Sequence, residues 1–151
     1  MVRLALALVA VLALLATSCT RLPQRRIEFV EPPPSGDVAA FVTAELERAR
    51  RDGHSVLVYV GASWCEPCKR FHHAVETGQL DGRLPNLRLL DFDRDRDGDR
   101  LAAAGYTSHY IPLFARPRPD GRSSQEQIEG SVKGDGAVAE ITPRLKALLS
   151  N

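Results

Sequence analysis

Cys65 and Cys68 are the two side chains of this sequence whose type and spacing are best suited to chemistry. Three positions apart at the start of a helix, they could form a disulfide within one turn or bind a metal ion. Backbone N–H groups and the positive end of the helix dipole would stabilise a thiolate at Cys65, and a thiolate is the attacking species in disulfide exchange. The pattern therefore favours redox chemistry, with Cys65 as the exposed nucleophile and Cys68, more covered, as the resolving thiol.

The residues around the pair modify this chemistry. Pro67, at an early helical position, costs no hydrogen bond and stiffens the turn. Lys69 and Arg70 add positive charge that favours a thiolate at Cys65, whereas the negative charge of Glu66 opposes it. The sequence alone does not show whether the three charges together favour or oppose the thiolate. Trp64 directly precedes the pair, and we interpret it as an apolar rim of the site rather than as a core residue.

Two other uses of the cysteine pair stay open at this point. A structural disulfide would gain little from closing so small a loop, because the entropic benefit grows with loop length. A zinc site that adds His72 or His73 to the pair lacks an evident fourth ligand, and without a metal these histidines would lie on a partly exposed helix surface. Residues 93–98 imitate the start of a calcium loop, but its twelfth position is Ala104, which favours a solvated connection.

The sequence also predicts the elements that must hold the pair. Residues 55–60 form a continuous apolar, β-branched run that suits a strand covered on both faces, and a helix follows from Cys65 to about Thr77. Asp37 is the expected N-cap of an earlier helix that ends at Gly53. Further strands are predicted at residues 87–92, 112–115 and 127–132, and further helices at residues 101–104 and 137–149. This alternation, closed by a hairpin, implies an α/β fold with a mixed central sheet flanked by helices on both faces.

The hexapeptide Trp64-Cys65-Glu66-Pro67-Cys68-Lys69 after an apolar strand resembles the motif of the thioredoxin superfamily. The predicted order of elements over residues 37–150 is similar to that fold, with residues 27–30 as a candidate first strand. The resemblance implies a thioredoxin-like domain at residues 37–151 with a redox-active Cys65–Cys68 disulfide. It also implies thiol–disulfide oxidoreductase activity that needs no metal or organic cofactor.

The same resemblance gives Pro112 a place beside the active site. It implies a cis Ile111–Pro112 bond, with Pro112 as a third catalytic position and the Ile111 backbone pairing with an extended segment of the substrate. A cis X–Pro bond is a minority state in folded proteins, so this expectation depends on the family likeness alone. By the same likeness, the rest of the substrate-binding rim comprises Trp64, Glu66, Pro67 and Lys69.

Two positions depart from the thioredoxin pattern. Thioredoxins carry a buried Asp in the strand before the motif, which helps to move the proton of the second cysteine, and here that register holds Tyr59. A phenol is a poor base near neutral pH, so Glu66 or water would have to take the proton. Glu66 itself stands where thioredoxins usually have Gly. Both differences favour a dedicated exported relative over a general reductase.

Residues 1–18 read as a targeting segment. Arg3 is followed by an apolar run from Leu4 to Ala16, which is shorter than the roughly 20 residues of a membrane-spanning helix. With Cys19 directly after it, the segment resembles a bacterial lipoprotein signal, which implies acylation of Cys19. Ordinary cleavage nearby, with Cys19 left as a stray thiol, is the alternative. Residues 19–36, with three consecutive prolines, would then be a tether.

Length and charge narrow the function. A chain of 151 residues fits one domain plus a targeting segment, and its formal net charge of +1 argues against a nucleic-acid partner. We expect a monomeric, lipid-anchored protein on the periplasmic side of a membrane that reduces disulfides in exported clients. An upstream redox donor would be its other partner. Pro67 and the aliphatic Ile111 resemble reducing members of the superfamily. The alternatives are a binding module with idle cysteines and a metal-handling protein.

Overall fold

The computed structural model describes residues 26–150. The elements follow one another as β1 (Ile27–Val30), α2 (Val38–Asp52), β2 (Ser55–Gly61), α3 (Glu66–Glu76), β3 (Leu87–Asp93), α4 (Arg94–Ala103), β4 (Leu113–Pro117), β5 (Ser123–Glu129) and α5 (Ala137–Ser150). The predicted signal peptide, Cys19 and the first part of the predicted tether lie outside the described residues. Within residues 26–150, every helix is too short or too polar to cross a membrane.

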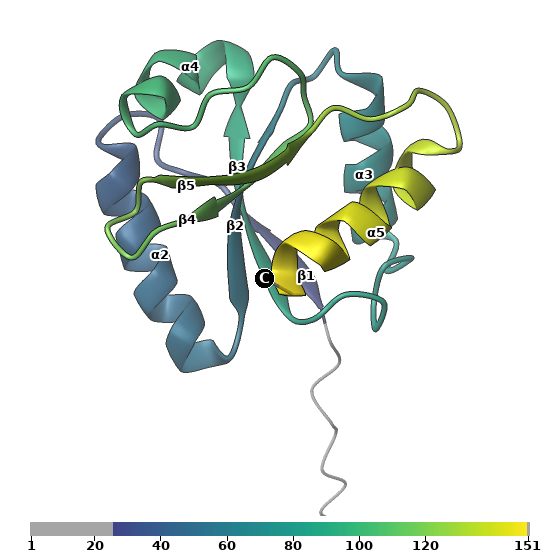
Figure 1. Ribbon diagram of the computed structural model, residues 1–151, viewed down its shortest axis with the longest axis horizontal. Helices are drawn as coiled ribbons and strands as arrows, with labels where there is room; N and C mark the ends of the chain where they lie inside the picture. Colours follow the sequence, from purple (N-terminus) through teal and green to yellow (C-terminus); the bar gives the residue numbers. More distant parts are fainter. Residues whose placement is uncertain (1–25, 151) are drawn as a thin grey trace, which may run out of the picture.

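The five strands form one mixed sheet in the order β1-β3-β2-β4-β5. β1 and β2 run parallel to β3, whereas β4 runs antiparallel to β2 and forms a hairpin with β5. Helices α3 and α5 cover one face of the sheet, and α2 and α4 cover the other (Figure 1). The predicted α/β architecture, a mixed sheet with helices on both faces, is confirmed.

Strand β2 fills both halves of the core because its side chains alternate between the two faces. Leu57 and Tyr59 pack with α3 and α5, whereas Val58 and Val60 pack with α2 and α4. All four are buried, as expected for a continuous apolar run in the centre of a sheet. The strand therefore delivers the chain to the Cys65 loop from a rigid position between two cores.

The first helix is bounded as the sequence predicts. The Asp37 side chain accepts a hydrogen bond of 2.7 Å from the Ala40 N–H, which satisfies one of the free donors at the start of α2. Gly53 ends the helix at a φ of 71°, a left-handed conformation that glycine adopts at little cost. Helix α2 thus begins and ends at the predicted residues.

The sheet begins earlier than the domain start predicted at residue 37. Strand β1 forms its edge and pairs with β3 from Ile27↔Leu87 to Val30↔Leu90. The proline segment that follows is also attached, because Arg100 Nη2 donates to the Pro33 carbonyl at 2.8 Å. Residues 27–30, the candidate first strand predicted from the sequence, are therefore strand β1, and the proline segment after it contacts α4.

Helix α4 corrects the prediction of a short helix at residues 101–104. It begins at Arg94, because the Asp93 carboxylate accepts from the backbone N–H groups of Asp95 and Arg96 at 2.9 and 3.0 Å. Asp97, predicted to lie in a solvated connection, is completely buried. Burial alone would raise the pKa of Asp97, but hydrogen bonds from Arg96 and Arg100 outweigh it and lower that pKa. The calcium-like segment is the start of a helix.

The last strand is also displaced from its prediction. The sequence places it at residues 127–132, whereas β5 spans Ser123–Glu129. Its pairing with β4 ends at Leu113↔Glu129, and Gly130, with a φ of 66°, leaves the ladder while donating to the Pro112 carbonyl at 2.9 Å. The polar residues of this edge strand conceal it, because the apolar pattern on which the prediction rests is confined to its end.

Candidate active site

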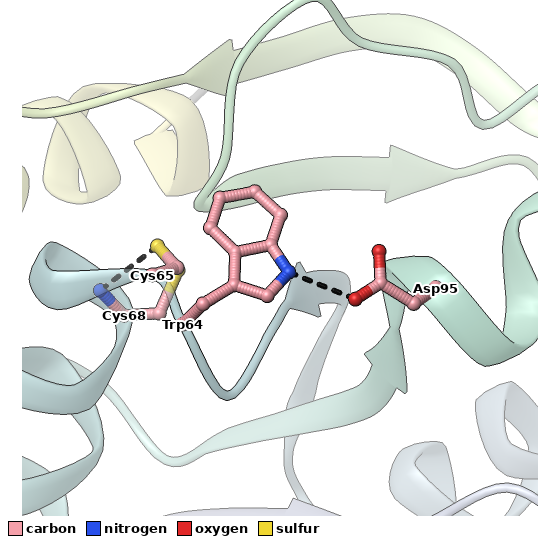
Figure 2. Close-up of a disulfide and its surroundings, with 4 residues drawn as sticks. All are labelled: Trp64, Cys65, Cys68 and Asp95. Atoms are coloured by element: carbon pink, nitrogen blue, oxygen red, sulfur yellow. Dashed lines mark hydrogen bonds between the residues drawn. A yellow bond between two sulfur atoms is a disulfide. The ribbon is translucent and has the colours of Figure 1, made fainter.

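Cys65 and Cys68 are joined by a disulfide with an S–S distance of 1.98 Å at the start of α3. Cys65 is the N-cap of the helix, and its sulfur accepts a hydrogen bond of 3.3 Å from the Cys68 backbone N–H (Figure 2). Pro67 occupies the first turn, where its missing N–H is no loss. The helix therefore directs its free N–H groups, and the positive end of its dipole, at the sulfur of Cys65.

Both cysteines are buried, which corrects the expectation that Cys65 is exposed. The exposed fraction is 4% for Cys65 and 1% for Cys68, so the order agrees with the prediction that Cys68 is the more covered of the two. The sulfur of Cys65 is bonded to Cys68 and lies over the first turn of α3, where it receives the Cys68 N–H. This describes the oxidised state, in which neither sulfur is a free thiol.

Glu66 does not act as an unpaired negative charge beside Cys65. Its carboxylate pairs with Arg70 and accepts the Gly134 backbone N–H at 3.1 Å, while Arg70 also donates to Asp135 at 2.6 Å. The hydrogen bond from Arg70, and then that from Gly134, lower the pKa of Glu66. The charge of Glu66 is thus balanced locally, and its oxygens are engaged. Lys69, which is exposed one turn after Cys65, keeps its positive charge near the site.

Trp64 lies at the surface, as expected for a rim residue. It is 60% exposed, and its indole N–H donates to Asp95 Oδ2 at 2.8 Å. Figure 2 shows the indole between the disulfide and the start of α4. Asp95 was not singled out in the sequence, because only the folding of residues 94–103 into α4 brings its carboxylate to Trp64.

The Ile111–Pro112 bond is cis, as the family likeness implies. In the antiparallel pairing of β2 with β4, the last pair is Val60 opposite Leu113, and Pro112 directly precedes Leu113. Pro112 therefore lies at the edge of the sheet where β2 ends and the chain enters the Cys65 loop. Ile111, partly buried, packs against both core clusters, and the neighbouring Tyr110 is 68% exposed.

Tyr59 occupies the position at which thioredoxins carry a buried acid. It is completely buried, and its hydroxyl has no hydrogen-bond partner within residues 26–150. Burial, and then the nearby Asp91 carboxylate, raise the pKa of the Tyr59 phenol above its usual value of about 10. Tyr59 is therefore a neutral phenol that can donate a proton in a hydrogen bond but cannot serve as a base.

One polar pair at the cavity that Cys68 lines is not apparent from the sequence, which predicts His72 as a residue of a partly exposed helix surface or a zinc ligand and does not single out Asp91. In the structure His72 is partly buried, and its Nε2 lies 3.5 Å from Asp91 Oδ2. Two signals could have found the pair: His72 follows Cys68 by one helical turn, and Asp91 lies opposite Tyr59 in the pairing of β2 with β3.

The sequence left open a zinc site that adds His72 or His73 to the cysteine pair. Over the described part of the chain, no group of three or more His, Cys, Asp or Glu side chains is arranged to hold a metal ion. The two cysteines are instead bonded to each other. A cysteine pair held this closely at a helix start can alternate between dithiol and disulfide, which is the chemistry of a thiol–disulfide oxidoreductase.

Comparison with known proteins supports this interpretation of the fold and of the cysteine pair. Poplar thioredoxin h is 23% identical, with a TM-score of 0.50, and the match covers 83% of this chain and 98% of that one. A mutant of poplar thioredoxin h is 22% identical, with a TM-score of 0.52 and coverage of 83% and 84%. A mutant thioredoxin from Halobacterium salinarum is 20% identical, with a TM-score of 0.47 and coverage of 83% and 89%. At these identities the two poplar structures, with TM-scores of 0.50 and 0.52, show the fold.

No curated protein matches the chain. The model of a family described as thioredoxin-like matches residues 37–119, which is more than half of the chain and includes the Cys65–Cys68 disulfide and the cis bond before Pro112. By this match the chain belongs to the thioredoxin-like family.

Proposed function

We propose that this protein is a thiol–disulfide oxidoreductase of the cell envelope that reduces disulfides in exported client proteins. The observation that carries the proposal is the Cys65–Cys68 disulfide at the start of α3, with the Cys68 N–H directed at the sulfur of Cys65. That hydrogen bond and the helix dipole favour a thiolate at Cys65 once the disulfide is reduced. The pairing of Glu66 with Arg70 removes the main local opposition to this charge.

The reaction proceeds in two exchanges that move one pair of electrons. The Cys65 thiolate attacks a client disulfide, forms a mixed disulfide and releases one client thiolate, which takes up a proton. Cys68 then attacks Cys65, releases the second client thiol and restores the Cys65–Cys68 disulfide. The client gains two electrons, the protein loses two, and a dithiol donor elsewhere in the envelope must reduce the protein again.

The substrate would bind across the rim formed by Trp64 and the residues around Pro112. Trp64, directly before Cys65, and Tyr110, directly before the cis Ile111–Pro112 bond, both present exposed aromatic surface. The backbone of Ile111, at this same edge, would pair with an extended segment of the client, as in relatives of this fold. Such a rim favours unfolded or flexible clients, whose backbone is free to pair.

The reducing direction is supported by resemblance. Pro67 before the second cysteine and Ile111 before the cis-proline resemble reducing members, whereas strongly oxidising members often carry His before the second cysteine. Equilibration of the couple with glutathione measures its potential. A reduction potential of about −270 mV, typical of thioredoxin, would support a reductase, whereas a potential of about −120 mV would indicate an enzyme that oxidises its clients.

Location in the envelope is proposed from residues 1–19. A signal cleaved before Cys19, and a lipid on that cysteine, would hold a monomer on the periplasmic side of a membrane. Incorporation of radiolabelled palmitate into the wild type, and its loss in Cys19→Ala, would support this anchor. Recovery of unlabelled wild-type protein in a soluble periplasmic fraction would instead support a free exported enzyme.

The activity itself is tested by two serine variants. Cys65→Ser should abolish reduction of a protein disulfide such as that of insulin, because no nucleophile remains. Cys68→Ser should accumulate mixed disulfides with client proteins, since the resolving thiol is missing. If Cys65→Ser retains full function in cells, the protein is a binding module rather than an oxidoreductase, and the proposal fails.

A further inference from the structure

A cavity of about 390 Å³ lies behind the disulfide, between α3 and β3. Cys68, Tyr59, His72 and Asp91 all contribute to its wall. The Tyr59 hydroxyl, completely buried and without a partner within residues 26–150, belongs to this wall. A cavity of this size with polar walls admits water, so a proton on Cys68 has a path into it.

His72 is held in one orientation within this wall. Its ring stacks on that of Phe29 with centroids 4.0 Å apart and planes 4° apart, and its centroid lies 5.2 Å from that of the Tyr59 ring, with the two planes inclined at 62°. Asp91 Oδ2 lies 3.5 Å from His72 Nε2, so Nε2 is the ring nitrogen that faces a carboxylate. Because residues four apart on a helix are neighbours, His72 and Cys68 share one face of α3, and both line the cavity.

The other groups that could take a proton here are less suitable. Tyr59 is a neutral phenol, and Glu66 is engaged by Arg70 and Gly134. Asp93 caps α4 through the Asp95 and Arg96 N–H groups. The remaining charged or titratable side chains around the cavity are Glu31, Lys69, His73, Glu76 and Arg96. None of these side chains has all three features of His72: a position one helical turn from Cys68, a ring stacked on an aromatic neighbour, and a carboxylate beside it.

We infer that His72, oriented by Asp91, accepts the proton of Cys68 when the mixed disulfide is resolved, in place of the buried acid that thioredoxins use. The inference rests on the proposed function. The Cys68 S–H bond breaks and its proton passes to His72, directly or through water in the cavity. The sulfur electron pair forms the bond to Cys65 Sγ, and the bond from Cys65 to the client sulfur breaks. The client thiolate leaves with the electron pair of the broken bond and takes the proton from His72.

Imidazole suits this role because its charge changes near neutral pH, where the enzyme must both accept and return the proton. Asp91, which faces Nε2, would stabilise the imidazolium that forms and leave the other ring nitrogen, Nδ1, to accept the proton of Cys68. A third group orients the histidine in the same way in other nucleophile–histidine pairs. Asp91 is thus a positioning residue, whereas His72 exchanges the proton itself. The arrangement joins Cys68, His72 and Asp91 from two elements, α3 and β3.

The test follows one turnover with oxidised glutathione as the probe. The full chain carries Cys19→Ser in every sample, so that Cys65 and Cys68 are the two thiols present. Acid-quenched samples are separated by intact mass spectrometry into reduced protein, the glutathione adduct on Cys65 and the internal disulfide. In His72→Gln we expect adduct formation at the wild-type rate and resolution slowed by about 100-fold, the lower range for loss of a general base.

Three matched samples distinguish proton transfer from a structural effect. His73→Gln removes the adjacent, exposed imidazole and should resolve the adduct like the wild type. Asp91→Asn should slow resolution less than His72→Gln does and should change its pH profile. In His72→Ala, free imidazole added to the buffer should restore part of the resolution rate, which a role in packing alone would not allow. Circular dichroism confirms that each variant is folded.

The outcomes separate the inference from the proposed function. Resolution at the wild-type rate and with the wild-type pH profile in His72→Gln would overturn the role of His72 while leaving the oxidoreductase intact. Slow resolution in His73→Gln to the same extent would also overturn it. If the wild type forms no adduct with glutathione at any pH at which it is folded, the proposed function fails before the role of His72 arises.

Discussion

Two polar clusters lie on opposite faces of the sheet, and β1 contributes one residue to each. The Arg88 cluster, on the α2 face, comprises Glu28, Glu45, Asp52 and Arg88. The His72 cluster, on the α3 face, comprises Phe29, Tyr59, His72 and Asp91. Because successive strand residues point to opposite faces, Glu28 and its neighbour Phe29 supply one cluster each.

The two clusters differ in how completely their polar groups are paired. Arg88 is 10% exposed and donates to Glu28 at 2.6 Å and to Asp52 at 3.1 Å. Burial alone would lower the pKa of Arg88, but these hydrogen bonds outweigh it and raise that pKa. In the His72 cluster the pair is longer, at 3.5 Å, and a cavity adjoins it.

The difference in pairing indicates which of the two clusters can accept and release a proton. A guanidinium with carboxylate partners on several sides is held in one charge state, so its cluster can only stabilise the fold. An imidazole beside one carboxylate and a cavity that admits water can change its charge without breaking a network. The comparison therefore predicts that changes to the Arg88 cluster affect stability alone, whereas changes to the His72 cluster affect the resolution of the mixed disulfide.

The largest effect on stability is expected for Arg88→Met. The substitution leaves the buried Glu45 carboxylate without this guanidinium and removes the partner of Glu28 and Asp52, which should cost about 3 kcal/mol of unfolding free energy. Urea denaturation measures the loss. The rate at which the glutathione adduct is resolved should not change under conditions where the variant is folded.

Arg83→Met is the matched control for this change. Arg83 is exposed in the connection before β3, so its loss should change the unfolding free energy by about 0.5 kcal/mol or less. If Arg88→Met instead slowed resolution while its stability matched that of Arg83→Met, the division of roles between the two clusters would be wrong.

An intermediate effect is expected for Phe29→Leu. The change keeps an apolar side chain but removes the ring on which His72 stacks, so the imidazole loses its fixed orientation. We expect a loss of about 1 kcal/mol in unfolding free energy and a several-fold slower resolution of the adduct. Urea denaturation and the quenched glutathione reaction measure the two quantities on one preparation.

Phe41→Leu separates the two consequences of Phe29→Leu. Phe41 is also partly buried and also meets an aromatic ring, that of Phe92 at 6.0 Å, but it lies on the α2 face. Its substitution should cost a similar free energy and leave the resolution rate unchanged. Equal rates for the two variants would show that the stacked ring does not orient His72 for the reaction.

The parts of the molecule that the sequence predicted correctly depend on local chemistry. Asp37 and Gly53 bound α2 through their own capping and backbone preferences, and the apolar run at residues 55–60 favours a buried strand. The cysteine spacing allowed a disulfide or a metal site, and the family likeness implied the disulfide and the cis bond at Pro112. Each of these depends on a few consecutive residues.

The parts that were missed depend on partners distant in the sequence. Helix α4 is capped by Asp93 and buries Asp97 between two arginines, and a run of alternating charges does not reveal that arrangement. Strand β5 is defined by its pairing with β4 rather than by its own polar residues. The pairing of His72 with Asp91 likewise requires the register of β2 on β3, which no local pattern gives.

The smallest effect is expected for Tyr59→Phe, although Tyr59 occupies the position of the acid in thioredoxins. Its hydroxyl has no partner within the described residues, so its removal should leave the unfolding free energy unchanged or raise it by up to about 1 kcal/mol. Resolution of the glutathione adduct should change by less than about three-fold, because the acceptor on His72 remains. Urea denaturation and the quenched reaction again measure both.

Gly61→Ala provides an internal check on this prediction. A Cβ at Gly61 would lie 2.7 Å from the Tyr59 hydroxyl oxygen, whereas the nearest ring carbons lie at 3.1 Å. Gly61→Ala should therefore cost less stability in the Tyr59→Phe background than in the wild type, which would show that the phenol sits where the structure places it. If, with that geometry established, Tyr59→Phe slowed resolution as strongly as His72→Gln, the hydroxyl would be an essential link between Cys68 and the imidazole. The two faces of the sheet would still differ as described, but the proton would reach His72 through Tyr59 rather than directly or through water alone.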